Sequence, residues 1–321
     1  MSKSQWHGIC LFGLRFVGVG IFIALLFETD WPSLAEITVH LGWKSLLVVV
    51  VGSVLALVLG MMRWVYLLQT QRIPVAPLRG FWIVGASFFL GVLTPGRAGE
   101  LLKIAPLKWG GHGLVPLSFS VIAERVLDGV VVLASAGLGF WYINKGLFYP
   151  ELWVWSPLAV GVLLLALYLQ ARLRNRIARL WGVGGGNTRL YEIVERLQKS
   201  LGELVPIKWK QWAIIVLLSI CIWLVDYWLF HILARWAAVP ISFVETVIVV
   251  SIASLITALP ISIAGLGTRD LALIYVFEAL GLPESSALTF SILFLYILIC
   301  GLGIGFFCWL RVPIEPVPMG E

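Results

Sequence analysis

Long apolar segments recur along this chain, and they constrain its fold more than any other feature. A helix of about 20 apolar residues is long enough to cross the hydrocarbon core of a bilayer. Segments of this kind occupy residues 8–27, 45–68, 114–141, 152–170, 211–234 and 286–310. Charged residues make up 12% of the chain, whereas soluble domains contain about 25%. The sequence therefore predicts an all-α polytopic membrane protein, with about six spanning helices and a single membrane domain over residues 1–321.

Two further apolar regions, residues 80–108 and 243–280, are each interrupted by proline and glycine. In the first region, the legs 81–93 and 97–108 are each about 18 Å long as helices, which is too short to cross a core of about 30 Å. Broken helices are tolerated at membrane depth where protein or water covers the backbone. We expect two re-entrant helical hairpins, with the alternative that each region is one kinked span. The expected helix-breaking positions are Thr94, Pro95, Gly96, Gly99, Pro260, Gly265 and Gly267.

The distribution of positive charge predicts the orientation of the chain. If the N-terminus lies in the cytoplasm, most basic residues fall in cytoplasmic loops. The largest group of them lies in residues 171–210. The opposite loops contain only Lys44, Lys145 and Arg235. Because Lys and Arg are retained in cytoplasmic loops, we expect both termini in the cytoplasm and the two hairpins to enter from opposite faces. The unit of span, hairpin and span then recurs in inverted orientation, over about residues 45–141 and 211–310.

Residues 171–210 form the one sizeable polar segment of the sequence. A basic cluster at its start is followed by three glycines, at 184–186, and then by apolar residues with helical spacing at 190–204. This pattern predicts an amphipathic helix on the cytoplasmic surface. The helix either recruits anionic lipid headgroups or serves only as a topological anchor.

Charged residues cluster after the first break and in the span that follows it. They recur at every third position after the break, so they share one face of a short helix. A charge at the centre of a bilayer costs about 2.5–3.5 kcal/mol, so these groups must be paired or line a wet cavity. We expect them to bind substrate, with a structural ion-pair network as the alternative. The residues are Arg97, Glu100, Lys103, Glu124, Arg125 and Asp128.

Arg97 is the best candidate among them for contacting a ligand. It lies at a helix start, where free backbone N–H groups and the helix dipole favour an anion. A guanidinium group can also hold a phosphate through two hydrogen bonds. Arg269 and Asp270 stand at the equivalent point after the second break, so we include both among the expected substrate-binding residues.

The sequence contains no pattern typical of a catalytic centre. Its four cysteines and four histidines lack the spacing of a metal site, and no Ser-His-Asp or HExxH arrangement is evident. Gly265-x-Gly267 lacks the third glycine of a dinucleotide-binding loop. The basic residues follow membrane topology instead of marking a nucleic-acid site. We therefore expect a protein that is not an enzyme and uses no cofactor, metal or nucleic acid.

The breaks and charges resemble those of the lysylphosphatidylglycerol synthase transmembrane-region family, also called flippase-like membrane proteins. The similarity covers about residues 10–310. Its third piece departs from the family pattern, with Ile261 to Ala264 in place of a proline- and glycine-rich stretch and Asp270 in place of Glu, so we expect substrate choice to differ there. The matching pieces are Leu93-Thr94-Pro95-Gly96-Arg97-x-Gly99-Glu100-x-x-Lys103, Glu124-Arg125-x-x-Asp128, and Pro260 through Gly265-x-Gly267-x-Arg269-Asp270.

This resemblance implies lipid translocation in a prokaryotic inner membrane. Bifunctional members carry a soluble aminoacyl-transferase domain after the membrane part, whereas this chain ends at Glu321, so we expect a stand-alone member. The expected substrate is an anionic phospholipid or a polyprenyl- or terpenoid-linked lipid, bound through its headgroup or phosphate.

Two alternatives to translocation remain open. One is a membrane-embedded lipid headgroup transferase, with Glu124 or Asp128 as general base. The other is a non-transporting partner of a lipid-linked glycosyltransferase. Assembly into a homo-oligomer, or with a lipid-biosynthetic enzyme, is compatible with all three functions.

Overall fold

The computed structural model describes residues 39, 41–108, 112–143, 204–258 and 268–312. Every element in these ranges is a helix, so the predicted all-α architecture is confirmed. The predicted spans at 8–27 and 152–170 lie outside the described residues, as does most of the polar segment at 171–210.

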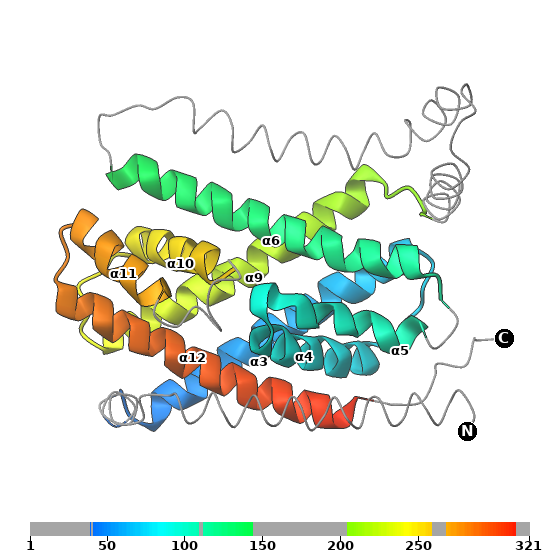
Figure 1. The fold of residues 1–321 in the computed structure, drawn as a ribbon, viewed down its shortest axis with the longest axis horizontal. Helices are drawn as coiled ribbons and strands as arrows, with labels where there is room; N and C mark the ends of the chain where they lie inside the picture. Colours follow the sequence, from blue (N-terminus) through cyan, green and yellow to red (C-terminus); the bar gives the residue numbers. More distant parts are fainter. Residues whose placement is uncertain (1–38, 40, 109–111, 144–203, 259–267, 313–321) are drawn as a thin grey trace, which may run out of the picture.

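Long helices form the frame of the described part of the chain (Figure 1). α3 (Trp43–Thr70), α9 (Trp209–Trp236) and α12 (Glu284–Arg311) each contain 28 residues and are apolar enough to cross a membrane. At 1.5 Å per residue, such a helix is about 42 Å long, more than the bilayer core of about 30 Å. A fourth long helix, α6 (Leu114–Ile143), carries the charged residues expected for its span.

The first interrupted region forms two short legs. α4 (Pro77–Leu93) is the first leg. The second leg begins as a 3₁₀-helix, η1 (Pro95–Ile104), and continues as α5 (Ala105–Lys108). The chain changes direction at Thr94, whose backbone is extended (φ −114°, ψ 139°), and the two legs pack against each other. The region is therefore a helical hairpin and not a single kinked span.

Thr94 and Gly99 close this hairpin. The Thr94 hydroxyl donates to the Leu90 carbonyl oxygen at 2.9 Å and accepts a hydrogen bond from the Gly99 N–H at 2.6 Å. A side chain at position 99 would overlap the Leu90 carbonyl group, and a side chain at Gly91 would come within 2.5 Å of the Glu100 Cγ atom. Glycine at these two positions thus allows the legs to approach each other closely.

The second interrupted region is also divided into two helices. α10 (Phe243–Ala258) and α11 (Thr268–Ala279) pack against each other. The expected helix-breaking residues Pro260, Gly265 and Gly267 lie between them, outside the described residues.

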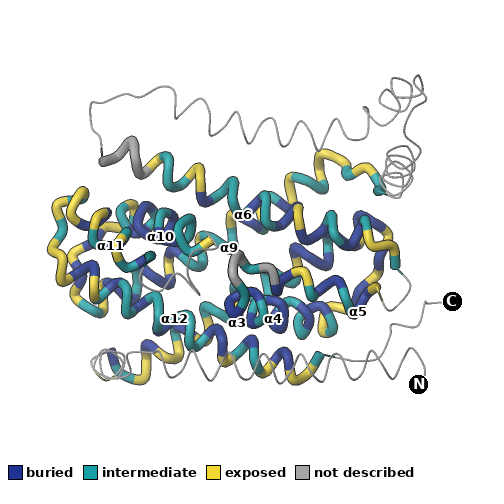
Figure 2. Tube along the Cα trace, viewed as in Figure 1, coloured by how far each residue is buried: buried dark blue, intermediate teal, exposed yellow. Residues whose placement is uncertain are grey.

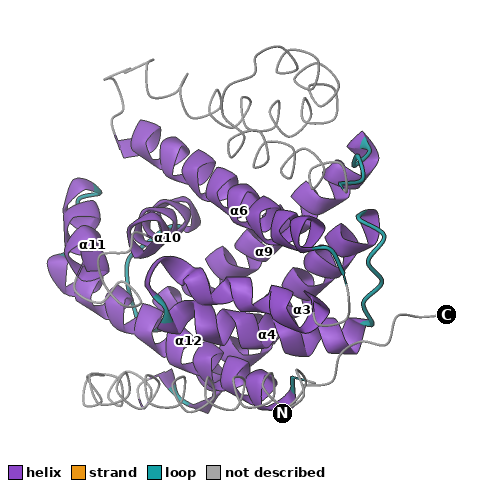
Figure 3. Ribbon diagram, turned by 45° about the vertical axis from the view of Figure 1, so that its right-hand side comes forward, coloured by secondary structure: helices purple, strands orange, loops and turns teal. Residues whose placement is uncertain are grey.

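The two hairpins occupy equivalent places in two structural units. In one unit, α3, the first hairpin and α6 follow one another; in the other, α9, the second hairpin and α12 do so. α4 packs against α12, its counterpart α10 packs against α6, and α3 packs against α9. The hairpins enter the bundle from opposite sides (Figures 1 and 3), and α10 contacts η1 between them. This is the arrangement expected of an inverted repeat, in which the last helix of each unit supports the hairpin of the other.

Burial follows the pattern of a bundle surrounded by lipid (Figure 2). The largest apolar cluster lies mainly in the second unit and includes the buried rings of Phe230, Phe277 and Phe290. By contrast, α3 exposes Leu47 and Val51 by 54% and 56%. Large exposed apolar side chains on a spanning helix are stable where lipid, and not water, is the neighbouring medium.

Candidate functional site

The charged residues of η1 form one row because of the helix type. A 3₁₀-helix has three residues per turn, so side chains three positions apart lie directly above one another. Arg97, Glu100 and Lys103 therefore align along η1 and face α6. Runs of 3₁₀-helix longer than about four residues are uncommon, which makes this element of 10 residues an unusual one.

Glu124 and Asp128 of α6 are held by a buried arginine, Arg63, which was not among the predicted site residues. Arg63 of α3 places its Nε atom 3.2 Å from Glu124 Oε1 and its Nη1 atom 2.5 Å from Asp128 Oδ1. It also donates to the Ser219 hydroxyl of α9 at 3.0 Å. The Arg63 side chain is only 5% exposed. It joins three helices of the bundle through charge-assisted hydrogen bonds.

Lys103 supplies the second cation to Glu124. Its ammonium group forms an ion pair with Glu124 Oε2 and lies 5.6 Å from the centre of the Trp64 ring. The Lys103 and Glu124 side chains are 4% and 3% exposed. This buried pair and Arg63 therefore connect η1, α6 and α3.

Arg97 and Arg125 share the remaining carboxylate, that of Glu100. Arg97 Nε lies 3.6 Å from Glu100 Oε1, and Arg125 Nε lies 3.1 Å from Glu100 Oε2. Arg125 also donates through Nη2 to Asp128 Oδ2 at 2.8 Å. The structure thus brings six of the predicted site residues together in one network, to which Arg63 belongs as well.

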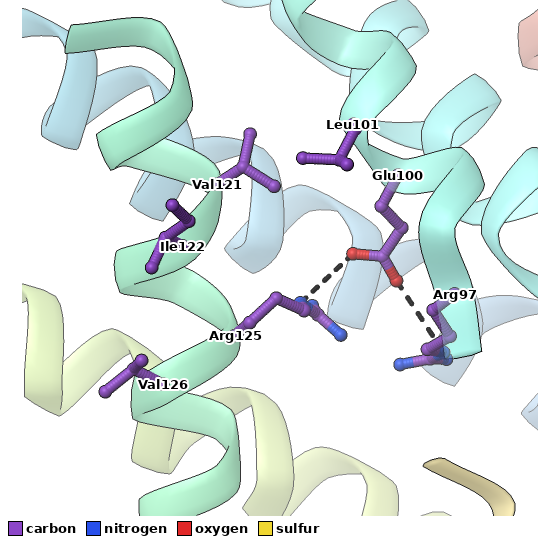
Figure 4. A pocket seen from close by; sticks show the side chains of 7 residues that line it. All are labelled: Arg97, Glu100, Leu101, Val121, Ile122, Arg125 and Val126. Carbon is purple, nitrogen blue, oxygen red and sulfur yellow. Dashed lines mark ion pairs between the residues drawn. The ribbon is translucent and has the colours of Figure 1, made fainter. Parts of the chain in front are cut away.

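The network opens at one place into a cavity of about 230 Å³. Figure 4 shows Arg97 and Arg125 on either side of Glu100, with apolar side chains lining the rest of the wall. The Arg97 and Arg125 side chains are 39% and 36% exposed, whereas Glu100 is 7% exposed. The wall is completed by Leu101, Val121, Ile122 and Val126.

The backbone of Arg97 is in the left-handed region, with φ of 57°. A residue with a side chain pays about 1–2 kcal/mol for this conformation. Its N–H donates to the Thr94 carbonyl oxygen at 3.1 Å, and its guanidinium group lies 6.0 Å from the centre of the Phe88 ring. The hairpin turn therefore holds this arginine at the mouth of the cavity despite the conformational cost.

Arg269 and Asp270 form a separate site in the second unit. Arg269 Nη2 lies 3.0 Å from Asp270 Oδ1, and the Ser291 hydroxyl donates to the same oxygen at 2.5 Å. The guanidinium carbon of Arg269 is 5.0 Å from the centre of the Phe294 ring, and its side chain is 3% exposed. These contacts all lie within α11 and α12, so the structure divides the predicted binding residues between two places.

The importance of Arg63 could have been recognised from the sequence. Arg63 is the one charged residue within the apolar segment 45–68, and a charge in a spanning helix marks a functional or structural site by default. Its partners Glu124 and Asp128 lie about sixty residues further along the chain, so no local spacing could have indicated them.

Comparison with known proteins places the whole arrangement in one family. The family model of the lysylphosphatidylglycerol synthase TM region matches residues 11–303. The chain belongs to this family. No curated protein and no solved structure matches this chain.

Membership of the family, together with the apolar helices, makes the chain a multi-pass membrane protein. The family is linked to the modification or translocation of membrane lipids. The matched region includes both hairpins, the ion network and the Arg269–Asp270 pair. The geometry of the network is therefore best considered in relation to a lipid.

Proposed function

We propose that this protein moves an anionic lipid across the cytoplasmic membrane, with the cavity at Arg97 and Arg125 as the headgroup site. The observation that carries the proposal is the pair of arginine side chains, each more than a third exposed, beside an apolar wall. Two arginines with free donors fit the oxygens of a lipid phosphate. The apolar wall fits the first carbons of an acyl or prenyl chain.

The rest of the network supports the two arginines. Arg63, Lys103, Glu124 and Asp128 have side chains at most 14% exposed and are paired with one another, so they are not available to a ligand. They fix α6 against η1 and α3, which sets the distance between Arg97 and Arg125. Some charged residues of the cluster therefore form a structural ion-pair network, while Arg97 and Arg125 of the same cluster bind the headgroup.

The inverted repeat suggests how the headgroup moves. Each hairpin packs against the last helix of the other unit, and inverted-repeat transporters work by movement of one repeat against the other. In one packing the Arg97 cavity faces the cytoplasm, in keeping with cytoplasmic termini; in the other the headgroup passes toward the Arg269–Asp270 pair. Such movement requires no covalent step, so the proposed function is transport and not catalysis.

The buried pairing argues against a headgroup transferase. A general base must offer a lone pair to the proton that it removes. Glu124 is bound by Arg63 and Lys103, and Asp128 by Arg63 and Arg125, so both carboxylates are already engaged by cations. A glycosyltransferase partner would be recognised by copurification and is not required by the geometry.

Reconstituted vesicles test the role of the cavity directly. We expect Arg97→Ala and Arg125→Ala to lower the rate of headgroup movement of a fluorescent phosphatidylglycerol by at least about tenfold, since each loses a charge-assisted hydrogen bond worth about 1.5–3 kcal/mol. Arg235→Ala is the matched control, because Arg235 is an exposed arginine at the end of α9. Wild-type rates in both cavity variants would contradict the proposed function.

A further inference from the structure

Asp226 is an acidic residue within the apolar helix α9. It is partly buried and lies within electrostatic range of Arg97 and Asp128. Ser219, two turns earlier on α9, receives a hydrogen bond from Arg63, so this face of α9 borders the ion network. Within the described residues, the Asp226 carboxylate forms neither an ion pair nor a hydrogen bond.

The helices packed against α9 present few charged groups to Asp226. α6 contributes Asp128, with which Arg63 of α3 and Arg125 of α6 are paired, and Arg97 of η1 acts on Asp226 from the neighbouring hairpin. α10 contains one charged residue, in its first turn, and those of α12 lie at its two ends. The neighbouring Tyr227 hydroxyl is directed to Ser251 of α10 at 2.8 Å. The charged groups near Asp226 therefore belong to the same network as the proposed lipid site.

Counting Asp226, the described network is electrically balanced. It then contains four basic and four acidic side chains, so binding a headgroup with one negative charge would leave one excess negative charge among buried groups. An uncompensated charge in such surroundings is unfavourable. The basic members are Arg63, Arg97, Lys103 and Arg125, and the acidic members are Glu100, Glu124, Asp128 and Asp226.

The excess charge is removed most easily at Asp226. Glu100, Glu124 and Asp128 each contact at least two cations, and protonating any of them would break ion pairs. Protonating Asp226 breaks no such contact. It also removes a negative charge that competes with the headgroup for Arg97.

We propose that Asp226 takes up one proton from water when a singly charged anionic lipid binds at Arg97 and Arg125, and releases it when the lipid leaves. The lipid then crosses together with a proton, and the occupied site carries the same net charge as the empty one. The inference rests on the proposed function for the location of the headgroup. It adds an energy source, since a proton gradient would drive the lipid in the direction in which protons flow.

Lipid affinity measured as a function of pH, with a pH indicator in weak buffer, tests this inference on the purified full-length protein. With fluorescent phosphatidylglycerol as the probe, we expect the wild type to take up one proton per bound lipid. Its affinity should fall by about tenfold per pH unit on the alkaline side. Asp226→Asn should bind without proton uptake and with little dependence on pH. Glu245→Gln, in the first turn of α10, should behave as the wild type.

The possible outcomes separate this inference from the proposed function. Lipid binding by the wild type without proton uptake overturns the role of Asp226 but leaves the headgroup site intact. Unchanged proton uptake in Asp226→Asn also overturns the role of Asp226 and leaves the headgroup site intact. Absence of lipid binding by the wild type at every pH overturns both. Because the proton count is measured first on the wild type, a variant that fails to fold does not remove the test.

Discussion

Arg63 connects three elements of the network. It contacts Glu124 and Asp128 on α6 and Ser219 on α9 from its own place on α3. The row of charges on η1 could be predicted from its spacing, whereas the contacts of Arg63 could not. They join helices that are distant in the sequence, and the partner of a buried charge is set by how those helices pack.

Removing Arg63 should destabilise the protein more than removing any cavity residue. Arg63→Leu leaves two buried carboxylates with one cation fewer, and breaking a buried pair costs about 3–5 kcal/mol. We expect a clear fall in the thermal unfolding temperature in detergent. Met62→Leu, at the neighbouring position exposed by 48%, is the control. Equal unfolding temperatures for the two variants would show that the network does not hold the helices together.

At the scale of elements, the first hairpin depends on the close approach of its two legs. The break at Thr94 and Pro95 was readable from the sequence because proline cannot continue a helix and the legs are short. The 3₁₀ geometry of η1 was not readable. It arises where the Glu100 side chain lies over Gly91 and the backbone at Gly99 lies against Leu90, and these are contacts between legs.

Gly99→Ala should open the hairpin. The added methyl group meets the Leu90 carbonyl group, which cannot move without breaking its bond to Thr94, and overpacking of this kind costs about 1–3 kcal/mol. Headgroup movement and thermal stability should both fall. Gly137→Ala in α6 is the matched control, since a methyl group there meets no atom within 4 Å. A wild-type phenotype for Gly99→Ala would mean that the legs do not need this contact.

At the scale of the whole molecule, two units with equivalent contacts contain different chemistry. The first surrounds Lys103 with Glu124 and the Trp64 ring, whereas the second places Arg269 over the Phe294 ring. When α6 and α12 are aligned from their first residues, Phe294 takes the place of Glu124. The ion pairs of the network therefore lie among elements of the first unit, whereas the corresponding position of the second unit holds an aromatic ring.

The charge distribution in the sequence indicated the repeat and placed Arg97 and Arg269 at equivalent points after the two breaks. The structure distinguishes them by exposure, at 39% and 3% of the side chain. Exposure depends on which side chains cover a residue, and Arg269 is covered by Phe294 and Ser291 of α12, whereas Arg97 borders the cavity. The position of each break could be derived locally, whereas the difference between the two sites required the packing of the bundle.

Headgroup movement in vesicles containing the wild-type protein shows whether the cavity at Arg97 and Arg125 selects an anionic lipid. Fluorescent phosphatidylglycerol and phosphatidylcholine, labelled on the same acyl chain, differ in the net charge of the headgroup. Because the open part of the site presents two arginines, we predict that the protein accelerates the movement of phosphatidylglycerol by at least about tenfold over phosphatidylcholine, a difference of about 1.4 kcal/mol. Equal rates for the two lipids, or rates no higher than in protein-free vesicles, would contradict the proposed function.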